Sequence, residues 1–173
     1  MSRISTIRAT KHMAKEIAYI QATSWQAAYR GIIPDANLDE FTPKKRTGII
    51  RKSIATSGQT YFLLCVDFNP IGMIVLGKAR DMDAQKDTGE VLAIYLLPDY
   101  WGAGYGYQML DFAMKWLQNE GYRLVFVWAL QENSRARAFY ERFGFVLDVK
   151  TDTIEIGKPL IMVRYRYAIS ARA

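Results

Sequence analysis

The fold of this chain is read most directly from residues 90–110, EVLAIYLLPDYWGAGYGYQML. The pattern predicts an apolar strand, then a turn with glycines at 102, 104 and 106, then an amphipathic helix. Glycines in such a turn let the backbone approach a ligand closely, and the first N–H groups of the helix carry the positive end of its dipole. The stretch therefore predicts a phosphate or pyrophosphate site. A purely structural strand-to-helix connection would show the same pattern.

The spacing of these glycines excludes two common nucleotide-binding motifs. Counted from Gly102, Tyr107 stands where a dinucleotide fingerprint needs its third glycine. No Lys-Ser or Lys-Thr pair follows, so the turn is not a Walker loop either.

Outward from this stretch, hydrophobic patterns predict alternating strands and helices. Strands are expected at residues 4–9, 61–66, 71–77, 91–97, 124–129, 145–149 and 160–167, and helices at 11–29, 43–55, 105–119 and 134–143, with a short helical piece at 38–41. We expect Thr10 to cap the first helix, and Thr42 with Pro43 to open the second long one. Because no repeat or linker is visible, we expect one α/β domain over residues 1–173 with a mixed sheet.

Composition narrows the class of protein. Half of the 173 residues (50%) are hydrophobic and 13% are aromatic, which excludes disorder as the dominant state. Lys and Arg exceed Asp and Glu by 23 − 17 = +6, a balance compatible with a polyanionic ligand, an acidic membrane or nucleic acid. The cluster at residues 44–46 is expected to be a solvated helix face. No zinc-finger or RRM signature supports nucleic-acid binding.

The single cysteine and single histidine limit the remaining chemistry. Cys65 cannot form an intramolecular disulfide and is expected in a buried strand rather than as an acyl-carrying nucleophile; His12 is expected at the surface. We therefore expect no metal centre. Because no targeting signal or membrane-length apolar run is present, we expect a cytoplasmic protein without membrane contact.

Two segments resemble a known family. WGAGYG at residues 101–106 resembles the acetyl-coenzyme A loop of the GNAT N-acetyltransferase superfamily, Arg/Gln-x-x-Gly-x-Gly/Ala; Gly104 and Gly106 match, while Trp101 replaces the leading polar residue. NSRARAFYERFGF at residues 133–145 resembles the family's Asn-x-x-Ala-x-x-x-Tyr-x-x-x-Gly-Phe segment at every specified place. The order of elements also resembles the GNAT fold. It implies an α/β (α+β) domain with a mixed, mostly antiparallel sheet of about six to seven strands and about four flanking helices.

The resemblance assigns the coenzyme site. It implies that Ile94, Tyr95 and Leu96 pair through their backbone with the pantetheine arm, and that Trp101, Gly102, Ala103, Gly104, Tyr105, Gly106 and Tyr107 hold the pyrophosphate. It also implies that Asn133 hydrogen-bonds the coenzyme and that Tyr140 stands near its sulfur as general acid. A phenol with a pKa near ~10 is protonated at neutral pH and can donate to a departing thiolate.

The base and the acceptor site are less defined. Several family members carry a glutamate base where Glu90 starts its strand, and partial desolvation there would suit a base. An exposed strand-end charge, with a water chain as the base, is the other interpretation. Trp25 and Tyr29, at i and i+4 of the first helix, are candidate walls of an acceptor groove; core packing explains the same spacing.

The resemblance implies an enzyme that transfers acetyl from acetyl-coenzyme A directly to a primary amine of a small molecule or peptide. A non-catalytic coenzyme A-binding sensor of the same fold is the alternative, and a nucleic-acid-binding protein rests only on the charge of +6. A polyamine, an aminoglycoside, an amino acid or a protein amine all remain open as acceptor, and a homodimer remains open as oligomeric state.

Overall fold

Residues 3–169 are described by a computed structural model, in which they form a seven-stranded sheet. The strand order is β1-β2-β3-β4-β5-β7-β6. The strands are β1 (Ile4–Arg8), β2 (Thr60–Val66), β3 (Asn69–Lys78), β4 (Thr88–Leu96), β5 (Leu124–Leu130), β6 (Val146–Glu155) and β7 (Pro159–Ala168). Every neighbouring pair is antiparallel except β4 and β5, which run parallel. The predicted mixed, mostly antiparallel sheet is confirmed, although β6 continues well beyond residue 149.

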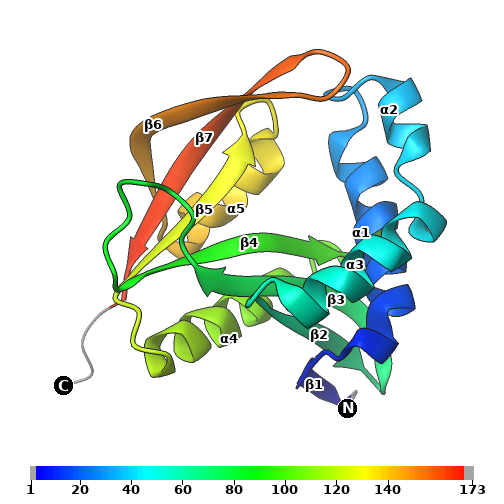
Figure 1. The fold of residues 1–173 in the computed structure, drawn as a ribbon, viewed down its shortest axis with the longest axis horizontal. Coiled ribbons are helices and arrows are strands. Elements are labelled where there is room, and N and C mark those ends of the chain that lie inside the picture. Colours follow the sequence, from blue (N-terminus) through cyan, green and yellow to red (C-terminus); the bar gives the residue numbers. More distant parts are fainter. Residues whose placement is uncertain (1–2, 170–173) are drawn as a thin grey trace.

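The helices lie on both faces of this sheet (Figure 1). They are α1 (Ala14–Tyr29), α2 (Asp35–Glu40), α3 (Pro43–Thr56), α4 (Tyr105–Asn119) and α5 (Ser134–Phe143), with short 3-10 turns η1 (Lys11–Met13) and η2 (Pro98–Tyr100). Residues 3–169 thus contain five α-helices, where about four were expected. The additional one is the six-residue α2, which overlaps most of the short helical piece predicted at residues 38–41. Across residues 3–169, no helix is both long enough and apolar enough to cross a membrane.

The buried side chains form three hydrophobic clusters, one on each face of the sheet and a smaller one around Trp25, Leu38 and Leu130. In β2, Tyr61 and Leu63 pack with α1 and α3, whereas Phe62 and Leu64 pack with α4 on the other face. Cys65 lies buried in the cluster that packs with α1 and α3, as predicted. The central strands are therefore covered on both faces, whereas the edge strand β6 is largely exposed.

The two predicted helix starts have different outcomes. Thr42 caps α3, because its Oγ1 accepts a hydrogen bond from the Lys45 N–H at 3.3 Å and Pro43 is the first helical residue. Thr10 is the N-cap residue of η1, which leads into α1 at Ala14, but its side chain makes no capping bond. The expected solvated face at residues 44–46 is correct for the two lysines, but Arg46 is half-buried.

The parallel strands β4 and β5 stay together over a short distance. Residues 88–91 of β4 pair with residues 124–127 of β5, and no pairing between described residues continues beyond Val91 and Val127. In the ladder with β3, Leu76 faces Val91 and Val75 faces Ala93, so Leu92 is the extra residue of a bulge. Because β4 bulges where β5 leaves it, the sheet opens at this point.

Candidate active site

A cleft of about 440 Å³ occupies the opening between β4 and β5. Residues from α1, β4, β5, the turn before α4, and α5 line it, among them Tyr29, Ala93, Ile94, Tyr95, Trp101, Gly104, Tyr107, Trp128, Asn133, Arg135, Phe139 and Tyr140. The cleft brings together most of the residues predicted for the coenzyme.

The edge of β4 that faces β5 is available along part of this cleft. Ile94 and Tyr95 pair with Ile74 and Met73 of β3 on one side only. The Leu96 carbonyl is already engaged, because it accepts from Ser24 Oγ at 2.9 Å and from Trp101 Nε1 at 2.6 Å. An extended ligand can therefore add to β4 as a strand would, at Ile94 and Tyr95 rather than at the Leu96 carbonyl.

The glycine turn opens α4 in the way the sequence predicts. Gly102 and Gly104 have φ of 79° and 84°, and an added Cβ at either would meet no atom within 4 Å. Gly104 is the N-cap of α4 and offers no side chain to the first-turn N–H groups, which leaves them for an anion. Packing explains the glycine at position 106, because an added Cβ would lie 3.2 Å from the Phe139 ring.

Two arginines to which the sequence assigned no role, Arg135 and Arg142, also line the cleft. The Arg135 guanidinium lies over the Trp101 ring, with Cζ 3.6 Å from the ring centroid. Partial burial lowers the pKa of Arg135, an effect too small to discharge a guanidinium. In the family motif, the position of Trp101 is occupied by Arg or Gln. Arg135 therefore supplies a positive charge next to the position where this chain lacks that polar side chain.

Asn133 is the N-cap residue of α5 and also lines the cleft. Its Oδ1 accepts from the Ala136 N–H at 3.1 Å and caps the helix, and the side chain is buried at the cleft wall. The amide nitrogen has no hydrogen-bond partner between residues 3 and 169, so capping leaves one donor for a ligand.

Tyr140 lies against the core with its hydroxyl toward the cleft. Only 6% of the residue is exposed, and its hydroxyl bonds to no other residue within 3–169. Burial, and secondarily the neighbouring Tyr29, raises the pKa of Tyr140 well above that of a free phenol. Tyr29 and Tyr95, which hydrogen-bond to each other, also have a pKa raised by burial. Three protonated phenols therefore surround this part of the cleft.

The structure separates the two candidate acceptor residues. Tyr29 lines the cleft as predicted for an acceptor wall. Trp25 does not line it: its ring stacks on Phe41 at 4.0 Å between centroids, and only 8% of the residue is exposed. Trp25 is a core residue that supports Tyr29 from behind, through a T-shaped ring contact at 5.3 Å.

The candidate base is not brought into the cleft. Glu90 is 1% exposed, so the interpretation as an exposed strand-end charge is wrong. Its Oε1 accepts from Arg80 Nη2 at 2.7 Å, and its Oε2 accepts from Arg80 Nε and the Arg80 backbone N–H. Glu90 is also absent from the cleft lining. The carboxylate is occupied by Arg80, and that pairing explains how it can be buried.

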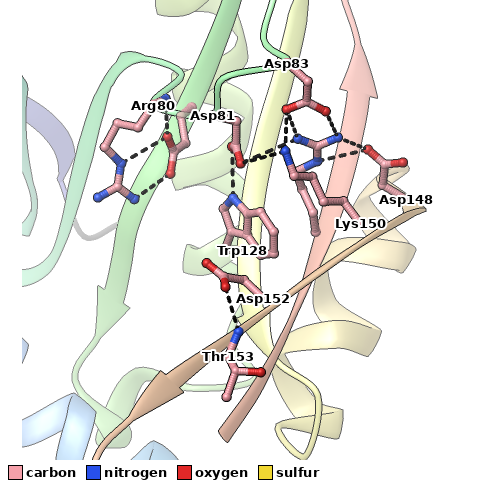
Figure 2. Close-up of polar contacts among 10 residues, drawn as sticks. Arg80, Asp81, Asp83, Trp128, Asp148, Lys150, Asp152 and Thr153 are labelled. Carbon is pink, nitrogen blue, oxygen red and sulfur yellow. Dashed lines mark hydrogen bonds and ion pairs between the residues drawn. The ribbon is translucent and has the colours of Figure 1, made fainter.

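The loop between β3 and β4 positions another cleft residue, Trp128. Asp81 accepts a hydrogen bond from Trp128 Nε1 at 3.1 Å, and two residues later Asp83 pairs with Arg164 and Lys150 (Figure 2). Arg164 also bonds to Asp148 of β6 at 2.6 Å. The loop is thereby fastened to β6 and β7, and the indole that forms one wall of the cleft is fixed.

Comparison with known proteins identifies this architecture. Residues 15–145 match the Acetyltransferase (GNAT) family, and the chain belongs to that family. The predicted resemblance is confirmed.

Among relatives, the chain is 26% identical over 135 residues to the uncharacterized N-acetyltransferase YuaI of Bacillus subtilis, with 75% of this chain and 73% of YuaI covered. It is 29% identical over 86 residues to an uncharacterized N-acetyltransferase of Methanocaldococcus jannaschii, with 49% of this chain covered but only 38% of that protein.

Two solved structures share the fold. PaiA N-acetyltransferase of Thermoplasma acidophilum, in complex with coenzyme A, aligns over 95% of this chain and 99% of its own, with 21% identity and a TM-score of 0.73. YncA of Salmonella typhimurium, a putative acetyltransferase with acetyl-CoA, aligns over 99% and 97%, with 16% identity and a TM-score of 0.72.

Proposed function

We propose that this protein, acting as one domain, transfers an acetyl group from acetyl-coenzyme A directly to a primary amine of a small molecule or peptide. The observation that carries the proposal is the Tyr140 hydroxyl, which is free at a cleft beside the available edge of β4. The bound coenzyme A and acetyl-CoA of the two structural neighbours support the choice of donor. The buried, unpaired Cys65 suits a reducing compartment, so we propose a cytoplasmic location.

The chain offers groups that fit each part of the donor. The uncapped first turn of α4, together with Arg135 and Arg142, suits a pyrophosphate. The free edge at Ile94 and Tyr95 suits an amide-bearing arm, and the spare Asn133 amide adds a further donor. When bound, the coenzyme supplies an activated acetyl group as a thioester.

In the proposed transfer, the amine nitrogen bonds to the acetyl carbon while the carbon–sulfur bond breaks. Tyr140 Oη gives its proton to the sulfur as the thiolate departs. The raised pKa of Tyr140 keeps that proton in place until it is needed. A neutral phenol at this position serves chemistry, whereas binding alone does not require it.

The amine must lose protons for this reaction, and no carboxylate lines the cleft within residues 3–169. Because Arg80 occupies Glu90, we propose that these protons leave through water in the cleft rather than to Glu90.

The test is release of free thiol from acetyl-coenzyme A across a panel of primary amines, with binding of the donor followed by calorimetry. Amine-dependent thiol release is expected. Tight coenzyme binding without release for any amine would instead identify a sensor. Binding to DNA or RNA that weakens steeply with salt would favour the nucleic-acid alternative.

A further inference from the structure

A second cavity, of about 160 Å³, is lined by residues of α1, α3 and the sheet and shares part of its lining with the active-site cleft. Its lining mixes polar and apolar residues and includes two arginines: Gln21, Arg46, Ile49, Ile50, Ser53, Gln59, Tyr61, Val75, Arg80, Leu92 and Ala93. Leu92 and Ala93 also line the cleft. The two cavities therefore meet at the bulge of β4.

The bulge explains why the cavities share these two residues. Consecutive residues of a regular strand point to opposite faces, yet Leu92 and Ala93 both pack with the α1 and α3 core. Val91 before them and Ile94 after them pack with the α4 core. The lining of the cleft thus extends from the glycine turn to Tyr29 and Tyr95, and the second cavity lies on the face of the sheet that packs with α1 and α3.

The two arginines of this cavity differ in their charge balance. Arg80 is paired with the buried Glu90. Arg46 is half-buried, with Nε donating to the neutral Gln21 Oε1 at 3.0 Å and Cζ 4.7 Å from the Phe41 ring centroid. No carboxylate within residues 3–169 pairs with Arg46. Its charge is positioned, partly desolvated and uncompensated, and both terminal nitrogens are left to donate.

The charge of Arg46 also reaches the reaction end of the cleft. Burial raises the pKa of Tyr95, and among the smaller influences Arg46 lowers it. Tyr95 lines the cleft and hydrogen-bonds Tyr29. Arg46 of α3 and Tyr95 of β4 both lie on the face of the sheet that packs with α1 and α3.

We infer that Arg46 binds a carboxylate of the acceptor in this cavity, so that the acceptor is an amine that also carries a carboxylate. The inference rests on the proposed function and names its substrate class. No Asp or Glu of the described chain lines either cavity, so polycationic amines such as polyamines and aminoglycosides find no counter-charge here. Among the acceptors left open by the sequence, an amino acid or similar amino carboxylate fits best.

The experiment uses a series of ω-amino acids from glycine to 6-aminohexanoate, each beside its primary amide. A carboxylate raises the pKa of a nearby ammonium, so proton loss alone would favour the amides. We expect the reverse: for the chain length that spans the two cavities, kcat/KM for the acid exceeds that for the amide roughly 10- to 100-fold. Equal rates for acids and amides at every length would overturn the inference.

Substitution at Arg46 assigns the preference to this side chain. R46Q is expected to remove the preference for the acid and leave the amide rate and the KM for acetyl-coenzyme A unchanged, while R46K restores part of it. R51Q, an exposed residue of the same helix that lines neither cavity, is the matched control. Equal loss for acid and amide in R46Q would assign Arg46 a structural role only.

A binding measurement separates this inference from the proposed reaction. The preferred amino acid is added to the coenzyme A-bound protein, and its Kd is measured by calorimetry for wild type and R46Q. Weaker binding to R46Q supports the carboxylate site even if no thiol is released. Binding unchanged by R46Q would overturn the inference even if acetyl transfer is observed.

Discussion

The guanidinium of Arg135 on α5 lies over the indole of Trp101, 3.6 Å from its centroid, although 34 positions separate the two residues. Trp101 is itself held by its Nε1 bond to the Leu96 carbonyl. The stacked pair therefore joins the end of β4, the glycine turn and α5 at the place where we expect the pyrophosphate.

Arg135→Gln should weaken acetyl-coenzyme A binding roughly 10-fold, because one charged donor to a phosphate is lost. The kcat with saturating donor should stay unchanged, and the loss should shrink at high salt. Calorimetry at two ionic strengths measures both. Arg123→Gln, an exposed residue outside the cleft, is the control. Equal donor affinity in wild type and Arg135→Gln would place the phosphates elsewhere.

Tyr140→Phe keeps the buried ring and removes only the hydroxyl. We expect kcat to fall roughly 10- to 1000-fold with little change in donor affinity, as for loss of a general acid. Since burial raises the pKa of Tyr140, the wild-type kcat should show no alkaline decline from this group up to about pH 10. Tyr122→Phe, in the same core but outside the cleft, controls for packing. Normal turnover in Tyr140→Phe would remove the assignment.

Gly104→Ala should damage donor binding through the backbone. A φ of 84° costs a residue with a Cβ about 1–2 kcal/mol, and relaxation of the turn would misdirect the first N–H groups of α4. Gly121→Ala is a matched control, because Gly121 follows the other end of α4, has a φ of 92° and also has open space. Both variants should lose similar thermal stability, but only Gly104→Ala should lose donor affinity. Equal affinities would show that the turn does not hold the pyrophosphate.

Glu90→Gln distinguishes a buried partner of Arg80 from a general base. We expect a loss of about 1–3 kcal/mol in the free energy of unfolding, because charge-assisted bonds are weakened. The acidic limb of kcat/KM should persist and should move when an acceptor of different amine pKa is used. A limb that disappears in Glu90→Gln, and is the same for both acceptors, would restore Glu90 as the base.

Asp83→Asn should alter how stability depends on pH. Hydrogen bonds from Arg164 and then Lys150 hold the pKa of Asp83 well below its usual range. A lowered folded-state pKa gives stability that is complete above the unfolded value, near ~4, and is lost as pH falls below it. Urea unfolding from pH 6 to pH 2 should show a shallower decline for Asp83→Asn than for wild type. The exposed Asp39→Asn should behave like wild type.

Sequence patterns predicted the elements and most residues of the cleft because these depend on local information. Alternation and continuous apolar runs predicted the strands, and the glycine turn before a helix start predicted the anion site. The two family segments then placed Asn133 and Tyr140, and the structure brings both to the cleft.

The residues that were missed or misplaced depend on contacts between distant segments. Trp25 and Tyr29 share one helix side, but only the position of Phe41 decides that the tryptophan is covered. Glu90 begins an apolar strand, yet the partner that occupies it comes from the preceding loop. The sequence places Arg46 in a basic run that was expected to be solvated. In the structure, Arg46 lines a cavity together with residues of β4.

The early end of the pairing between β4 and β5 gives this sheet a third free edge, inside the molecule. Outer edges of sheets invite other proteins to add a strand and to aggregate. This inner edge lies in a cleft lined by Tyr29 from α1 and Phe139 from α5 rather than at the border of the sheet. The protein can thus keep unpaired backbone groups for a slender extended ligand without offering them as a template for edge-to-edge association.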